Sequence, residues 1–174
     1  AVSNVLGSNI FNLLVVLGCC ALVKPVAAKW SLLKKEFPFS ILITIILLLV
    51  DSDFSIMKIL DGNQGFVLGR WAGLLFLILF VLVTSVVAAR KGENDLAVGN
   101  VVGSNIFNIL LILGVSSFIT PITLDVTAVY DTIILIIASI VVYVSAISKR
   151  EIQRKEGILF LVCYFAFFLY VFMR

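Results

Sequence analysis

The sequence lacks histidine altogether, and its 174 residues include only three cysteines. It also has no pair of acidic residues inside an apolar run and no nucleophile beside a base, so we expect no enzyme active site. Cys19, Cys20 and Cys163 lie in apolar runs, where a thiol is usually a small packing residue. Their spacing matches neither a disulfide framework nor a metal site, and we expect no bound cofactor.

Charged residues are also scarce, at 13% of the chain, whereas hydrophobic residues make up 62%. Soluble domains contain roughly 45–50% apolar residues, so a soluble fold of this size would have too little polar surface to cover itself. Several continuous apolar runs exceed the ~18 residues that indicate a transmembrane helix. We therefore expect an all-α, polytopic membrane protein that lies in the lipid bilayer. Its basic residues flank these runs, so nothing supports nucleic-acid binding.

Charged and loop-forming residues divide the apolar sequence into six segments. Lys24 and Pro25 end the first segment, and the basic stretch around Trp30 that follows is typical of a membrane interface. The expected helices cover residues 5–23, 37–50, 66–89 and 97–119, a fifth that begins near Asp125 and Asp131 and ends near Ser148, and 157–173.

A polar motif occurs twice in these apolar surroundings. Asn-Val-Leu-Gly-Ser-Asn-Ile-Phe-Asn at residues 4–12 returns as Asn-Val-Val-Gly-Ser-Asn-Ile-Phe-Asn at 100–108, and the copies stay aligned well past the motif. A repeat this close indicates internal duplication. We expect two three-helix halves, 1–81 and 82–174, within a single membrane domain.

The distribution of charge orients the two halves. Lys and Arg gather in the loops after the first, third and fifth expected helices, whereas the loops after the second and fourth are mainly acidic. Positive loops stay in the cytoplasm, so the two copies of the motif cross the membrane in opposite directions. Inverted repeats of this kind are typical of secondary transporters, whose binding site lies near the bilayer midplane between the repeats.

Each motif places a serine and an asparagine four residues apart, on one helix face. Ser8 and Asn12 form the first pair, and Ser104 and Asn108 form the second. One interpretation is that they only hold helices together through interhelical hydrogen bonds. The other is that the two pairs meet across a pseudo-twofold axis and present oxygens to one cation, since hydroxyl and amide oxygens suit Ca²⁺ and Na⁺. We predict a cation site at these four residues, with Asn9 and Asn105 bonding to helix backbone or to a neighbouring helix.

Residues 99–110, Gly-Asn-Val-Val-Gly-Ser-Asn-Ile-Phe-Asn-Ile-Leu, follow Val-Thr-Ser-Val-Val-Ala-Ala-Arg-Lys-Gly-Glu-Asn-Asp at 83–95. Together they resemble an α-repeat of the calcium/cation antiporter superfamily, the sodium/calcium exchangers and their prokaryotic relatives. Residues 2–18 are similar to the later part of the other α-repeat. The resemblance implies a fold of ten helices in two inverted halves, of which this chain contains about six.

The chain departs from the family pattern in one respect. Each family α-repeat opens with a Gly-Thr-Ser-Pro-Glu-like segment whose glutamate binds the cation, and neither copy is present here. At residues 80–84 the sequence continues without the helix and the second acidic segment that the family pattern has at this place. One explanation is that residues are absent here although the numbering is continuous, and we favour it because the chain also lacks a natural start. The other explanation is that the polypeptide itself is shortened. The remaining carboxylates are expected at helix ends, with Asp131 slightly inside: Asp51, Asp53, Asp61, Asp95, Asp125 and Asp131.

The resemblance implies a secondary-active antiporter of the prokaryotic plasma (inner) membrane. It would exchange Ca²⁺ against Na⁺ by alternating access, with H⁺ or K⁺ as other possible coupling ions, so monovalent and divalent cations are its expected partners. The alternative is a non-transporting helix bundle whose Ser/Asn pairs are only interhelical hydrogen bonds. The oligomeric state stays open at this point.

Overall fold

The computed structural model describes residues 2–50, 66–88 and 96–174, with the side chains of 66, 85–88 and 96 left aside. The expected carboxylates Asp51, Asp53, Asp61 and Asp95 lie outside the described residues. Both halves show the same order of elements, apart from the extra short helix α3. The first half contains α1 (Val2–Phe11), η1 (Asn12–Val16), α2 (Leu17–Val23), β1 (Val26–Ala27), α3 (Trp30–Lys34), α4 (Glu36–Leu49), β2 (Phe66–Leu68) and α6 (Arg70–Ala88). The second contains α7 (Leu96–Phe107), η2 (Asn108–Leu113), α8 (Gly114–Ile119), β3 (Ile122–Leu124), α9 (Val126–Lys149), β4 (Glu151–Ile152) and α10 (Arg154–Met173).

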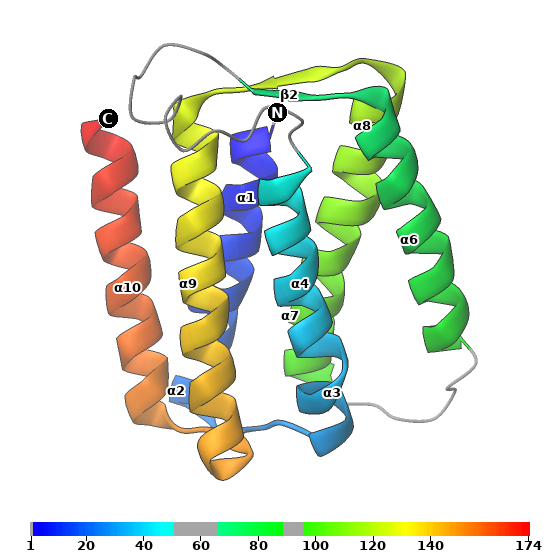
Figure 1. The fold of residues 1–174 in the computed structure, drawn as a ribbon. Helices are drawn as coiled ribbons and strands as arrows, with labels where there is room; N and C mark the ends of the chain where they lie inside the picture. Colours follow the sequence, from blue (N-terminus) through cyan, green and yellow to red (C-terminus); the bar gives the residue numbers. More distant parts are fainter. Residues whose placement is uncertain (1, 51–65, 89–95) are drawn as a thin grey trace.

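The two motif-bearing helices run in opposite directions. The helix formed by α1, η1 and α2 starts at the end of the bundle where both termini lie, and it finishes at the other end (Figure 1). The helix formed by α7, η2 and α8 starts at that other end and returns (Figure 1). The fold is therefore the predicted all-helical membrane bundle in which the motif and its copy are antiparallel.

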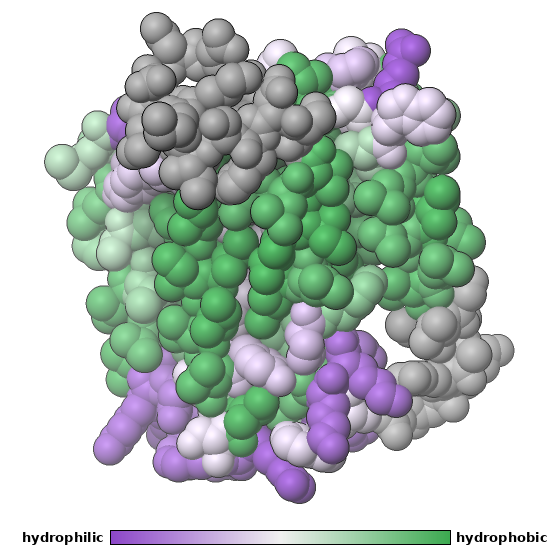
Figure 2. Space-filling model, viewed as in Figure 1, coloured by the Kyte–Doolittle hydropathy of each residue, from purple (hydrophilic) through white to green (hydrophobic). Residues whose placement is uncertain are grey.

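Four of the six expected spans are long and apolar enough to cross a bilayer by length and composition: 2–23, 97–119, 126–149 and 154–173. The apolar stretch Arg70–Thr84 of α6 is shorter, and α4 has 14 residues. Apolar side chains cover the middle of the visible face, and hydrophilic side chains gather at the end where α2, α3 and the start of α10 lie (Figure 2). This is the surface expected of a protein in a bilayer.

The expected helix over 66–89 is wrong at its start, because residues 66–68 form a strand. β2 pairs antiparallel with β3, with Val67 opposite Thr123, and β1 pairs antiparallel with β4, with Val26 opposite Ile152. Pro25 and Pro121 precede β1 and β3, where a proline prevents the helix from continuing. Each ladder joins one half of the chain to the other.

Some helix ends also differ from expectation. The last helix begins at Arg154, before the expected residue 157, because Gln153 and Glu156 form a reciprocal capping box at its start. Earlier in the chain, α6 is helical across residues 80–84, where Thr84 Oγ1 donates to the Phe80 carbonyl oxygen at 2.9 Å.

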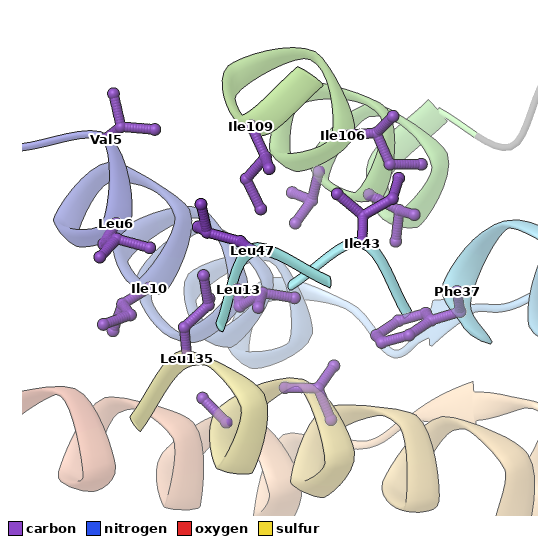
Figure 3. Close-up of a cluster of buried hydrophobic side chains, with 14 of the residues drawn as sticks. Val5, Leu6, Ile10, Leu13, Phe37, Ile43, Leu47, Ile106, Ile109 and Leu135 are labelled. Carbon is purple, nitrogen blue, oxygen red and sulfur yellow. The ribbon is translucent and has the colours of Figure 1, made fainter. Parts of the chain in front are cut away.

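Buried aliphatic side chains from four helical segments meet beneath the motif. Leu6, Ile10 and Leu13 of the first helix lie near Leu47 of α4 and Leu135 of α9 (Figure 3). Each of these five side chains is at most 3% exposed. Close-packed interiors hold side chains in fixed positions, so this cluster fixes the face that α1 and η1 present to α7 and η2.

Two close helix crossings, one from each half, rest on glycine pairs. Gly18 of α2 faces Gly157 of α10, and a Cβ built on Gly157 would lie 2.8 Å from the Gly18 carbonyl oxygen. Gly73 of α6 faces Gly114 of α8, and a Cβ on Gly73 would lie 2.7 Å from the Gly114 carbonyl oxygen. Small residues let membrane helices approach closely and gain van der Waals contact. A close glycine–glycine contact therefore attaches an outer helix, α10 or α6, to each motif-bearing helix.

Asp131 was expected near a helix end, and the structure buries it in α9 with 1% exposure. Both its carboxylate oxygens accept hydrogen bonds from the Arg174 guanidinium, at 2.7 and 3.1 Å. That hydrogen bond is the main reason why the pKa of Arg174 is raised. A raised pKa on a cation contributes stability that is fully present at every pH below its ordinary value, so the contribution of Arg174 is present at neutral pH.

Replacing Arg174 with alanine is expected to lower the stability of the bundle, because it leaves the buried Asp131 carboxylate without a partner. Breaking a fully buried pair costs about 3–5 kcal/mol, and the partial exposure of Arg174 reduces the expected loss to about 1–3 kcal/mol. Thermal unfolding in detergent micelles measures the change. Arg174→Lys keeps the charge but loses the two-pronged geometry and should lie between wild type and Arg174→Ala. Equal midpoints for all three proteins would show that the pair contributes nothing.

Candidate functional site

The four predicted site residues lie together where the two motif-bearing helices cross. Nδ2 of Asn12 donates to Oγ of Ser104 at 3.2 Å, and Nδ2 of Asn108 donates to Oγ of Ser8 at 3.3 Å. The two bonds are equivalent under the exchange of the halves. The duplication thus produces a symmetric polar crossing, with each asparagine facing the serine of the other copy.

Asn9 and Asn105 complete this crossing and are almost fully buried, at 0% and 2% exposure. Nδ2 of Asn9 donates to the Asn105 carbonyl oxygen, and Nδ2 of Asn105 donates to the Asn9 carbonyl oxygen, both at 3.3 Å. This confirms the prediction that they bond to the backbone of a neighbouring helix. Buried amides cost free energy unless they are paired, so these reciprocal bonds fix the register of the two helices.

The same two amides have a second function that the sequence did not indicate. Oδ1 of Asn9 accepts from Nδ2 of Asn108 at 2.8 Å, and Oδ1 of Asn105 accepts from Nδ2 of Asn12 at 3.4 Å. They therefore orient the side chains of the predicted site. Their place one residue after each serine was visible in the motif, but only the crossing geometry shows which atoms meet.

An inventory of donors and acceptors shows what the crossing leaves unused. The Asn12 and Asn108 amide nitrogens donate within the crossing, and the hydroxyls of Ser8 and Ser104 donate to the carbonyl oxygens of Val5 and Val101. No donor among the described residues reaches Oδ1 of Asn12 or Oδ1 of Asn108. The atoms that remain are acceptor oxygens, the kind of ligand that hard cations bind.

A π-helical turn begins at each of the two site asparagines: η1 starts at Asn12, and η2 starts at Asn108. Turns of this type insert an extra residue into an α-helix and frequently occur at functional sites. The residues just after each asparagine are buried in the core, Leu13 and Leu14 in one copy and Ile109 and Leu110 in the other, while the amide faces the other copy. No residue type in the motif is specific for a π turn, and the sequence did not predict it.

The structure brings no carboxylate to this crossing from the described residues. No group of three histidine, cysteine, aspartate or glutamate side chains in the described part of the chain could hold a metal ion. Asp131 is occupied by Arg174, and Asp125 is the residue before α9. The predicted residues therefore supply neutral oxygens, and negative charge would have to come from elsewhere.

Two antiparallel copies of one motif, crossing in a helical membrane bundle at a polar centre, define the inverted-repeat class of membrane transporter. The comparison with known families agrees with this class. The model of the sodium/calcium exchanger protein family matches residues 1–84 and 82–173, and the chain belongs to that family. It is thus grouped with cation antiporters of the membrane and not with enzymes.

Similar curated proteins come from several prokaryotes. The chain is 28% identical to the putative antiporter CaxA of Alkalimonas amylolytica. The alignment is 245 residues long and covers 96% of this chain and 76% of that protein. It is 28% identical to the inner membrane protein YrbG of Escherichia coli, with 91% of this chain and 72% of that protein covered. A match to the sodium/calcium exchanger MaX1 of Methanosarcina acetivorans reaches 38% identity over 92 residues, 52% of this chain and 26% of that protein.

The fold also matches solved structures. The sodium–calcium exchanger NCX_Mj superimposes with a TM-score of 0.72 at 19% identity, covering 97% of this chain and 75% of that protein. At this identity the likeness concerns the fold. It confirms that the chain adopts the helical architecture of the exchanger family.

Proposed function

We propose that this chain is part of a secondary-active cation antiporter that exchanges Ca²⁺ against Na⁺ by alternating access. The cation binds between α1–η1 and α7–η2, at oxygens of Ser8, Asn12, Ser104 and Asn108. Transport of one ion drives the opposite movement of the other across the membrane. Relatives whose names refer to sodium and calcium support this choice of ions, and H⁺ or K⁺ remain alternative coupling ions.

The observation that supports the proposal most strongly is the symmetric crossing itself. Asn12 and Asn108 each donate a hydrogen bond from the amide nitrogen to the serine of the other helix, which leaves their Oδ1 atoms available as acceptors. Reciprocal bonds from Asn9 and Asn105 keep the crossing in register before any ion arrives. A site organised in advance loses less free energy on ordering when it binds its ligand.

One of the two carboxylate-bearing segments of this site, the second acidic segment of the family pattern, is proposed to belong within α6. The two family matches meet at residues 82–84, and the alignment with CaxA extends over more residues than this chain contains. We infer that α6 joins the start of one family helix to the end of another, at the boundary between halves 1–81 and 82–174. The name of the E. coli relative supports placement in the prokaryotic inner membrane.

The 174-residue chain alone is expected to bind Ca²⁺ weakly, because Ca²⁺ takes six to eight oxygens that usually include carboxylates. Titration calorimetry of the purified chain in detergent should show no saturation below about 1 mM, the range of weak Ca²⁺ sites. The double variant Asn12→Ala/Asn108→Ala sets the background heat. Micromolar binding by the wild-type chain that disappears in the double variant would mean that the neutral oxygens suffice.

A second candidate function is a non-transporting bundle in which the Ser/Asn pairs only join the helices. The direct hydrogen bonds across the crossing favour it. Na⁺-gradient-driven Ca²⁺ uptake into vesicles separates the two candidates, when measured on a complete protein that contains this chain together with both acidic segments. Uptake that depends on Asn12 and Asn108 supports the antiporter. An absence of uptake, together with lower thermal stability of the Asn variants, supports the structural bundle.

A further inference from the structure

One end of the bundle carries a concentration of exposed basic side chains. They come from the α2–β1–α3 segment and from the α9–β4–α10 segment, which the β1–β4 ladder holds together. Hydrophilic side chains concentrate at this end of the visible face (Figure 2). The exposed cations are Lys24, Lys29, Lys34, Lys35, Lys149, Arg150, Arg154 and Lys155.

Two of these cations contact the same aromatic ring. Nζ of Lys34 lies 4.8 Å from the centroid of the Trp30 ring, and Cζ of Arg150 lies 4.9 Å from it. Cations at this distance are attracted by the negative face of the ring. Trp30 itself is 41% exposed at the first residue of α3. Tryptophan prefers the boundary between hydrocarbon and headgroups, so this cluster of three side chains lies at headgroup depth.

The backbone fixes Arg150 in place over the ring. Arg150 follows α9 with φ 55° and ψ 23°, the left-handed conformation that usually belongs to glycine at a helix end. Its carbonyl oxygen accepts a hydrogen bond from the amide of Ala28 at 2.8 Å, next to the β1–β4 ladder. A residue with a side chain keeps this conformation only when its surroundings impose it, and such positions are often functional.

The nearby carboxylates do not neutralise this pair of cations. Glu151 accepts a hydrogen bond from Nε2 of Gln153 at 2.9 Å, and Glu156 accepts from the Gln153 backbone amide at 3.0 Å. Within residues 2–50, 66–88 and 96–174, neither Lys34 nor Arg150 has a carboxylate at ion-pair distance. Two positive charges that share one ring are thus left available to an external anion.

We propose that Trp30, Lys34 and Arg150 bind the phosphate group of an anionic phospholipid in the membrane leaflet at this end. The two cations supply charge and hydrogen-bond donors to the phosphate, and the indole ring anchors the site at the boundary with the acyl chains. Anionic lipids of the cytoplasmic leaflet attract basic clusters in this way. The site lies at the opposite end of the bundle from the Asp131–Arg174 pair.

The test uses the only two tryptophans of the chain as reporters. Trp71→Phe leaves Trp30, whose fluorescence is measured in phosphatidylcholine vesicles that contain brominated phosphatidylglycerol or brominated phosphatidylcholine. We expect Trp30 to be quenched preferentially by the anionic lipid. Each basic residue near an anionic surface contributes about five-fold to binding, so Lys34→Ala or Arg150→Gly should lower the preference several-fold, and the double variant should abolish it.

Arg150→Gly is chosen because glycine adopts the left-handed backbone without strain, so this variant should fold at least as well as the wild-type chain. Lys155→Ala, which removes a neighbouring cation away from the ring, is the matched control and should keep the preference. In Trp30→Phe, the remaining Trp71, at the start of α6, should report no more than a weak preference. The proposal is overturned if Trp30 shows no preference, if Lys34→Ala/Arg150→Gly leaves it unchanged, or if soluble glycerol phosphate competes as well as the lipid does.

Discussion

Replacing Asn12 or Asn108 with alanine is expected to reduce Na⁺-gradient-driven Ca²⁺ uptake by about tenfold or more in an antiporter that contains this chain and the restored acidic segments. Each substitution removes one proposed cation ligand and also the amide that bonds to the serine and asparagine of the other copy. Loss of a single interaction with a charged group costs about 1.5–3 kcal/mol, which corresponds to at least a tenfold change. Uptake of radioactive calcium into sealed vesicles measures the effect.

The motif provides its own control. Asn4 and Asn100 are the first residues of the same two motif copies, but both are exposed and have no hydrogen-bond partner among the described residues. Alanine at either position should leave uptake within about twofold of wild type, as expected for a surface change. If Asn4→Ala and Asn12→Ala reduce uptake equally, the loss reflects the amount of folded protein in the membrane and not the site. The antiporter proposal would then lose its main support.

Gly73→Ala is expected to have the largest effect on stability. The added Cβ would lie 2.5 Å from the Phe118 backbone nitrogen and 2.7 Å from the Gly114 carbonyl oxygen, and neither backbone atom can move without shifting α8. Overpacking of this kind costs about 1–3 kcal/mol, and we expect the upper end because the obstacle is backbone. For a chain of this length the unfolding midpoint in detergent should fall by roughly 6–12 °C.

Gly103→Ala is the matched comparison, since a Cβ at Gly103 meets no atom within 4 Å. Alanine favours helix over glycine, so this variant should unfold at the same temperature or higher. Gly157→Ala tests the equivalent crossing in the other half, where a Cβ would lie 2.8 Å from the Gly18 carbonyl oxygen. A Gly73→Ala protein as stable as Gly103→Ala would mean that α6 does not pack closely against α8.

Much of this arrangement follows from the sequence. The apolar runs predicted the helices, and the repeated Ser-Asn motif predicted two equivalent halves. The alternating charge of the loops predicted that the two motif copies run antiparallel, as they do in the structure. The amide of Asn9 could be assigned to the neighbouring helix because a buried amide must find a partner, and Asn105 provides it. These predictions succeeded because they depend on periodicity and on hydrogen-bond satisfaction, which are local properties of the chain.

Other features depend on partners far away in the sequence. Phe66–Leu68 is apolar enough for a helix, and it becomes a strand because Ile122–Leu124 lies beside it. The burial of Asp131 depends on Arg174, which is 43 residues away. The π turns at Asn12 and Asn108 reflect how the leucines after them pack against other helices. Sequence pattern alone does not specify contacts of this kind, which only the assembled bundle creates.

The exchange of contacts between halves also has a consequence for how the protein is made. The helix formed by α1, η1 and α2 packs through α2 against α10, which is synthesised much later than α2. Until α10 has been synthesised, Gly18 lacks its contact with Gly157, and β1 lacks its pairing strand β4. Membrane insertion can proceed helix by helix, but the final packing of α2 has to follow the synthesis of α10.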